Sequence, residues 1–250
     1  MGLFDFFKGK SDKTAVDEKS LSRHAERIMD KRALSPDRFA SIDFLCKVGT
    51  PEGWRAVLPR FNFNVDPSIT DREEKQYIFD AAVLDPEHAI DPVCEFLKTA
   101  ETLHWPIKVL RKITTSERIV SELLAILDGF DTGYGRNADR KAQVIAELEN
   151  DNDPRIAESA LPFLRDFSED VRFHAVRTIM AQDAESEASA ALSKLLIEDE
   201  STRIRTTVLE GYLQNGWKVS HPDRAALERV LLTVATANWR LTDDGKVTRR

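Results

Sequence analysis

A recurring pair of short helices constrains this chain more than any other sequence feature. Helical periodicity dominates residues 18–237, and strand-like alternation is almost absent. The second helix of each pair begins at intervals of 32 to 35 residues, which predicts a solenoid whose hairpins bury their apolar faces against their neighbours. We expect helices at 18–33, 36–48, 51–61, 71–84, 86–98, 103–113, 116–128, 137–149, 154–166, 169–181, 185–197, 201–214 and 223–237.

The helix starts are marked by a capping residue followed by proline. The cap's side-chain oxygen accepts from free backbone N–H groups, and proline at the first helical position has no N–H to leave unpaired. Thr70 and Glu73 also have the spacing of a capping box. The four cap–proline pairs are Ser35-Pro36, Thr50-Pro51, Asp85-Pro86 and Asp153-Pro154.

Three of the first helices contain an internal proline at a similar place. Pro59, Pro92 and Pro162 are separated by 33 and 70 residues, which are one and two units of the repeat. An internal proline removes a backbone hydrogen bond and crowds the preceding turn. We therefore expect a kink that recurs at unit spacing.

The clearest repeat resembles a HEAT repeat, with a proline-bearing first helix and a second helix that opens with Asp-Val-Arg. In that family the valine packs between helices and the arginine bonds to acidic groups lining the inter-repeat turns. The resemblance implies these roles for Val171 and Arg172, and Ile204-Arg205 repeats the pair 33 residues later, although Arg203 stands in the acid's place. The residues that carry it are Ala160-Leu161-Pro162-Phe163-Leu164, Asp166, Glu169-Asp170-Val171-Arg172, Ala175 and Ile179, with a weaker echo at Asp139-Arg140-Lys141.

The resemblance covers 18–237 and is strongest over 154–214. It implies an all-α, armadillo-type, right-handed superhelix of about six helical hairpins whose second helices line a concave face. We expect an apolar tag and flexible linker at 1–17, the solenoid at 18–237, and a tail at 238–250 that could form a small hairpin around Asp244-Gly245.

No motif for chemistry stands out. The five histidines include no pair spaced three or four residues apart, and phosphate-loop and nucleophile-elbow motifs are missing. Cys46 and Cys94 lie in apolar helical segments, which favours buried, inert thiols over a disulfide or metal site. We therefore expect no catalytic residue, no cofactor and no metal.

The chain's formal net charge of -7 makes nucleic acid a poor partner. Two loop segments, 62–70 and 128–136, are either slack surface loops or binding loops. The partner-binding candidates are Trp105, Lys108, Arg111, Lys112, Tyr134 and Arg140, and the N-terminal docking candidates are Leu3, Phe4, Phe6 and Phe7.

These features predict a non-catalytic scaffold or adaptor that binds another protein through its concave face and loops. The alternative is a HEAT-like enzyme, either similar to alkylpurine DNA glycosylases or similar to phycobilin lyases. No apolar run is long enough to span a bilayer and no signal peptide is evident, so we expect a cytoplasmic protein. The N-terminal tag could make weak membrane contact instead of docking on a protein, and the sequence leaves the partner's identity and the oligomeric state open.

Overall fold

A computed structural model of the chain describes residues 17–135, 137–219, 224–233 and 238–249. Within these ranges the protein is mostly helical, with thirteen α-helices and one two-stranded sheet. The chain divides into two compact units at Ile113 and Thr114. The predicted all-α class is therefore confirmed at this level.

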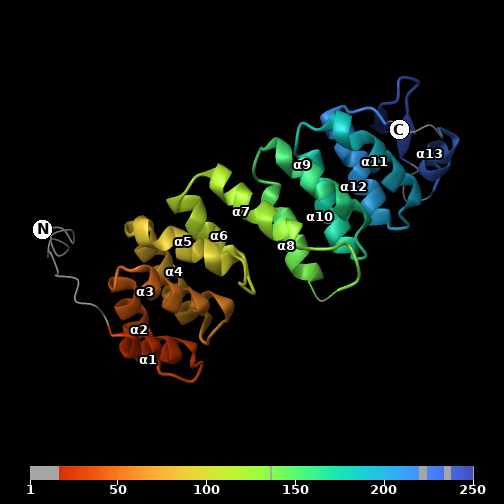
Figure 1. The fold of residues 1–250 in the computed structure, drawn as a ribbon. Helices are drawn as coiled ribbons and strands as arrows, with labels where there is room; N and C mark the ends of the chain where they lie inside the picture. Colours follow the sequence, from red (N-terminus) through yellow and green to blue (C-terminus); the bar gives the residue numbers. More distant parts are fainter. Residues whose placement is uncertain (1–16, 136, 220–223, 234–237, 250) are drawn as a thin grey trace, which may run out of the picture. The chain divides into compact units, whose positions relative to one another are not determined.

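Unit 1 holds six α-helices in its described part (Figure 1). The helices α1 and α2 form the first pair, α3 with its 3-10 extension η2 pairs with α4, and α5 pairs with α6. Their bounds are α1 Glu18–Met29, α2 Ser35–Lys47, α3 Pro51–Val57, η2 Leu58–Asn62, α4 Ser68–Leu84, α5 Pro86–Leu97 and α6 His104–Ile113.

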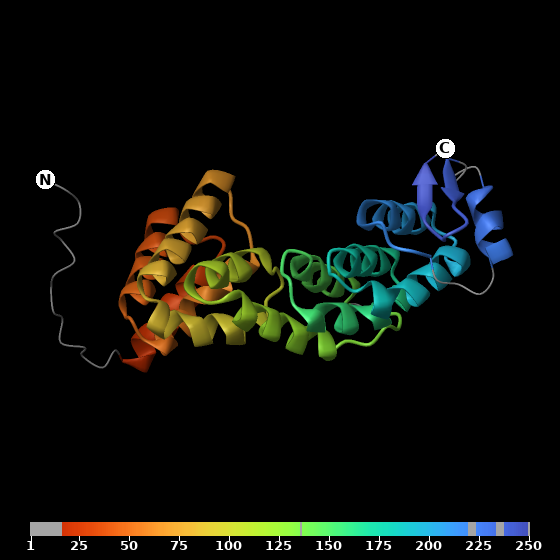
Figure 2. The same cartoon turned by 90° about the horizontal axis from the view of Figure 1, so that it is seen from above.

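Unit 2 continues the pairing and ends in a hairpin (Figure 2). Its helices are α7 Ser116–Asp128, α8 Ala138–Leu148, α9 Pro154–Ala160 with η3 Leu161–Arg165, α10 Glu169–Met180, α11 Glu185–Glu198, α12 Thr202–Asn215 and α13 Arg224–Leu231. The strands are β1 Trp239–Leu241 and β2 Val247–Arg249. The thirteenth helix is thus shorter than predicted, because Leu232 and Thr233 already lie outside it.

Helices of the same kind contact one another in sequence order within each unit. In unit 1, α2 packs on α4 and α4 on α6, while α1 packs on α3 and α3 on α5. In unit 2, α8 packs on α10 and α10 on α12, while α7, α9, α11 and α13 form the second layer. Each unit therefore buries its apolar residues between two helical layers.

Two of the four predicted caps form. The Thr50 hydroxyl accepts from the N–H of Gly53, and the Asp153 carboxylate accepts from the N–H of Arg155. At the other two starts the predicted side-chain bond does not form, although α5 does begin at Pro86 with Asp85 at its N-cap position. Helix α2 already includes Ser35, and the Asp85 carboxylate instead accepts from the indole N–H of Trp54 at 3.0 Å.

The predicted capping box at Thr70 is also wrong, because α4 begins two residues earlier, at Ser68. The reason is tertiary. Asp71 accepts from the backbone N–H of Val65 at 3.1 Å and from Arg60 at 2.8 Å, and these bonds hold the preceding turn against the start of the helix.

The internal prolines act in two ways. At Pro59 and Pro162 the α-helix gives way to a 3-10 turn, as expected where an N–H is missing. Pro92, in contrast, is buried inside a continuous α5. The prediction of one recurring kink is therefore correct for two of the three sites.

The predicted C-terminal hairpin is confirmed. Strands β1 and β2 pair antiparallel, and Gly245 adopts a φ of 87° in the turn between them, a conformation that favours glycine. In unit 2 this hairpin packs on α12 through β2 and on α13 through β1 (Figure 2).

A basic side chain at the fourth residue of three second helices, α2, α8 and α10, bonds to a backbone carbonyl of the turn before its own helix. Lys141 of α8 donates to the carbonyl of Asp131, and Arg172 of α10 donates to the carbonyl of Asp166. Arg38 of α2 donates in the same way to the carbonyl of Ala33. Lys75 of α4 donates instead to the side-chain oxygen of Asn64, and Arg205 of α12 to the carbonyl of Ile197 in the last turn of α11. These bonds tie five of the second helices to the segment that precedes them.

Candidate functional site

The predicted basic aromatic face of α6 is used for packing within unit 1. The Lys108 ammonium lies 4.3 Å from the Trp105 ring centre and 4.7 Å from that of Phe79, and it donates to the Gln76 side chain at 3.2 Å. The Trp105 ring stacks on Phe61 with centroids 5.7 Å apart. Trp105 and Lys108 therefore come together, as a contact between α4 and α6.

The other basic candidates differ in exposure. Lys112 is exposed at the last turn of α6, whereas Arg111 is half-buried. Arg140 lies in unit 2, is half-buried at the start of α8, and its pKa is lowered by that burial. The four N-terminal candidates, Leu3, Phe4, Phe6 and Phe7, lie outside the described residues.

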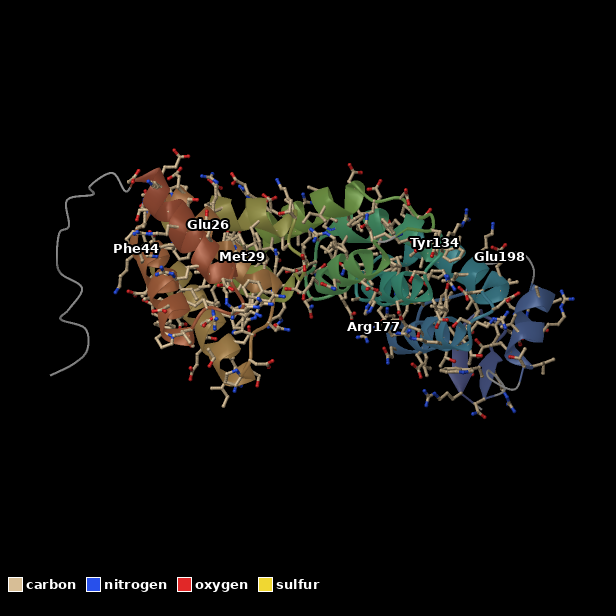
Figure 3. All side chains as sticks on the ribbon, turned by 90° about the horizontal axis from the view of Figure 1, so that it is seen from below. Glu26, Met29, Phe44, Tyr134, Arg177 and Glu198 are labelled. Atoms are coloured by element: carbon tan, nitrogen blue, oxygen red, sulfur yellow. The ribbon has the colours of Figure 1, made fainter. Side chains whose placement is uncertain are left out.

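Tyr134 is the most exposed of the predicted site residues in unit 2 (Figure 3). Its side chain is 86% exposed and meets Phe167, itself 68% exposed, edge to face with centroids 5.1 Å apart. The two rings belong to neighbouring turns, one before α8 and one before α10. They form an exposed aromatic pair.

The loop that carries Tyr134 is well anchored. The N–H of Phe167 donates to the carbonyl of Thr132 at 3.1 Å, and the Lys141 ammonium bonds to the carbonyls of Asp131 and Gly133 and to the Asp166 carboxylate. These bonds argue against the slack-loop interpretation of 128–136 for the part from 131 to 134.

An open groove lies on the second-helix layer of unit 1. It has a volume of about 610 Å³ and runs between α2 and α4. Its wall from α2 includes Pro36, Phe39 and Ala40, and its lining residues are Ser35, Pro36, Phe39, Ala40, Asp43, Thr70, Glu73 and Glu74. Leu34 and Ile69, each next in sequence to a lining residue, are 70% and 58% exposed. The groove thus combines exposed apolar side chains with carboxylates.

The aromatic wall of the groove is held in place from α4. The Phe39 ring meets Tyr77 with centroids 4.9 Å apart, and the Tyr77 hydroxyl donates to the Asp43 carboxylate. Burial raises the pKa of Tyr77, and the bond to Asp43 raises it further. Phe39 is consequently an exposed ring on a fixed support.

The two accessible carboxylates of the groove differ. Burial works to raise the pKa of Asp43, but the bonds from Tyr77 and Lys47 outweigh it and lower that pKa. Glu73 is exposed and makes no ion pair with any described residue. Because no lining residue is basic, the groove presents an anionic, partly apolar surface to a ligand.

The second-helix layer of unit 2 also carries a hollow, but its charges are paired. Arg177 of α10, labelled in Figure 3, bonds to Glu149 at 2.6 Å. Arg203 lies 3.7 Å from the Phe173 ring centre while bonding to Asp170. The aromatic ring is therefore covered by a guanidinium, in contrast to Phe39 of unit 1.

Sequence reasoning missed Phe39, Tyr77 and Phe167. In α2 the pattern gave no signal, because Phe39 precedes Ile42 by three residues and Cys46 by seven and so belongs to their apolar stripe in sequence. For Phe167 the signal was an aromatic residue directly before the Ser-Glu-Asp start of α10. Neither position could be separated from an ordinary surface aromatic by pattern alone.

The chemistry found in the described residues is limited. Cys46 and Cys94 are free and buried, and burial followed by the nearby Asp43 charge raises the pKa of the Cys46 thiol to about 12. Within the described ranges, no three His, Cys, Asp or Glu side chains gather as a metal site would require. Among those same ranges, no helix is both long and apolar enough to cross a bilayer.

No family model matches this chain, and no curated protein matches it in sequence. The function is therefore argued from the geometry of the two units.

Proposed function

We propose that this protein is a non-catalytic binding scaffold of the HEAT-like type, whose docking site is the α2/α4 groove of unit 1. In this proposal the six hairpins stack as a right-handed superhelix, and a partner chain inserts apolar and basic side chains between α2 and α4. The free, buried thiols agree with a reducing compartment such as the cytoplasm.

The observation that carries the proposal is an exposed aromatic ring held on a half-buried support, next to a carboxylate that makes no ion pair with a described residue. Phe39 leans on Tyr77, which Asp43 holds in turn, while Glu73 lies on the opposite helix. Binding energy in protein interfaces concentrates in preorganised aromatic anchors, because their side chains lose little entropy on association. Glu73 favours a cationic neighbour in the partner, whereas the charge of Asp43 is already balanced by Lys47.

The basic helix α6 gives less support to a nucleic-acid enzyme. Tracking a phosphate backbone needs several accessible cations along one surface. Lys108, the central cation of α6, is occupied by Trp105, Phe79 and Gln76. The proposal therefore assigns α6 a structural part in joining α4 to α5.

The test is a peptide selection on the full chain, followed by affinity measurements on the variant Phe39→Ala. We expect selected peptides to combine aromatic or aliphatic residues with Lys or Arg, and to bind Phe39→Ala at least about tenfold more weakly, a difference of about 1.4 kcal/mol. Circular dichroism checks that the variant stays folded.

Phe167→Ala is the matched control, since it removes an exposed aromatic ring from unit 2. We expect it to leave peptide affinity unchanged. If no peptide is enriched, or if both variants bind the selected peptides equally well, the groove is not the docking site.

A further inference from the structure

We propose that the α2/α4 groove has an occupant within the same chain, the N-terminal segment Leu3–Lys10, which competes with external partners. This inference rests on the proposed function of the groove as a docking site. The segment reads Leu-Phe-Asp-Phe-Phe-Lys-Gly-Lys, so three phenylalanines and a leucine are followed by two lysines.

The chemistry of the segment complements that of the groove. The groove offers the apolar side chains of Pro36 and Phe39, with Leu34 and Ile69 exposed beside it. Glu73 is its exposed carboxylate without an ion pair to any described residue, whereas Asp43 is already paired with Lys47. Aromatic rings of the segment would cover the apolar side chains, and Lys8 or Lys10 would face the unpaired Glu73.

The linker is long enough for this contact. Nine residues lie between Phe7 and Asp17, and an extended chain covers about 33 Å over these ten steps. Helices α1 and α2 are packed neighbours joined by a five-residue turn, so α2 runs back toward the start of α1. Asp43 lies eight residues after Ser35, which is about 12 Å along α2. Because α1 is roughly 18 Å long and α2 runs back along it, Asp43 lies most of the way back toward the start of α1. Crossing the width of α2 adds about 10 Å, so the path to the groove is shorter than the length that the extended linker can cover.

An intramolecular ligand also has an advantage of concentration. A short tether gives an effective concentration in the millimolar range, so even a weak contact is populated. The bound segment would hide Phe39 until a partner with higher affinity displaces it. The groove would then be regulated by its own chain.

The experiment is zero-length carbodiimide crosslinking of the full chain at low concentration, with peptide mapping of the monomer. We expect Lys8 or Lys10 to link to Glu73 or Asp43. The Lys47–Asp43 ion pair, at 2.9 Å, is the internal control for the chemistry. Mixing isotope-labelled and unlabelled chains separates a link within one chain from a link between two copies.

The apolar half of the contact is tested by a triple variant, Phe4→Ser, Phe6→Ser and Phe7→Ser, which keeps both lysines and both carboxylates. We expect the crosslink yield to fall at least about fivefold and the affinity for a selected groove peptide to rise by a similar factor. Asp5→Ser, in the same segment, should preserve the crosslink.

Several results would overturn the inference. These are a control link without the Lys8 or Lys10 link, links spread evenly over surface carboxylates, links only between labelled and unlabelled chains, or an unchanged yield in the triple variant. If groove peptides bind in a Phe39-dependent way but the crosslink is missing, the inference fails and the proposed function stands. If the crosslink forms but no peptide is selected, the N-terminal segment occupies the groove and the proposed docking of an external partner fails.

Discussion

The two units join their second helices by different polar devices. In unit 1, α2 and α4 meet over a buried charge cluster in which Glu74 accepts from both Arg38 and Arg60, at 2.8 and 2.7 Å. Arg60 also bonds to Asp71, which pairs in turn with Lys75. Glu74 and Arg60 are almost completely buried, so two helices and η2 depend on one carboxylate.

In unit 2 the second helices are linked to neighbouring turns by separate ion pairs instead of one shared cluster. Lys141 of α8 bonds to Asp166 in the next turn, and Arg172 of α10 bonds to Asp199 one turn further on. Asp166 and Asp199 also accept from the backbone N–H groups of Ser168 and Ser201. Each link therefore fixes one turn and one helix.

This difference explains why the resemblance to HEAT repeats was clear only in the second half. A one-to-one ladder places the same residue types at a regular interval, and that regularity can be read in sequence. A shared cluster draws its members from η2, α2 and α4 at unequal spacings, so it has no period. Two units of similar architecture can thus differ in how easily their repeats are recognised in the sequence. The family assignment itself stays a prediction.

The largest expected effect comes from removing the shared carboxylate. Glu74→Gln leaves the buried Arg38 guanidinium without a carboxylate and Arg60 with Asp71 alone. Breaking a buried ion pair in this way costs about 3–5 kcal/mol. Asp199→Asn in unit 2 removes a single ladder acid and should cost about 1–3 kcal/mol. Urea unfolding of the full chain, with hydrogen exchange to assign each loss to α4 or α10, measures both.

Glu73→Gln is the matched control for this comparison, because it changes the exposed neighbour of Glu74. We expect a change within about 0.5 kcal/mol. Equal losses in the Glu74 and Asp199 variants would show that the cluster is not more critical than the ladder.

We expect a smaller difference in the free energy of unfolding from alanine substitutions at two glycines, each of which lies in a close helix contact within its own unit. A Cβ at Gly53 of α3 would lie 2.8 Å from the carbonyl oxygen of Leu45, and backbone cannot move aside cheaply. A Cβ at Gly211 of α12 would meet the Met180 side chain at 2.6 Å, and that side chain can change rotamer. Gly53→Ala should therefore cost about 1–3 kcal/mol in the free energy of unfolding.

For Gly211→Ala we expect a net change within about 1 kcal/mol, since the higher helix propensity of alanine offsets the rearrangement of Met180. Thermal and urea unfolding of both variants make the comparison. A larger loss for Gly211→Ala would mean that the contact between α10 and α12 is the more rigid of the two.

The smallest effect is a pH dependence carried by unit 2. Burial, followed by the charges of Arg177 and Arg203, lowers the pKa of His174, and its Nδ1 is buried with no hydrogen-bond partner in the described structure. A histidine with a lowered folded-state pKa contributes stability above its unfolded pKa of about 6.5 and loses that stability as the pH falls below it.

We therefore expect His174→Gln to unfold with a weaker pH dependence than the natural chain between pH 7 and pH 5. Urea midpoints of both proteins across this range provide the measurement. Parallel curves would show that protonation of His174 does not contribute to acid sensitivity.

Much of the helical order was predictable because its causes are local. Proline, capping oxygens and apolar periodicity act within a few residues, so the helix positions and the C-terminal hairpin could be read directly from the chain. The errors in predicted helix caps and helix starts arose where a residue distant in the sequence bonded to a side chain that was expected to make a local bond. The Asp85 carboxylate is taken by Trp54, and the start of α4 is set by Asp71 with Arg60.

The candidate site could not be predicted in the same way. Trp105 and Lys108 were proposed as surface anchors, but Phe61, Phe79 and Gln76 from other elements engage them. Phe39 became a candidate because α2 and α4 leave a groove between them. The sequence by itself determined where each helix lies along the chain, because backbone hydrogen bonding is decided over a few residues. Only the tertiary structure decided which side chains are engaged and which stay exposed, because those partners lie about one repeat away.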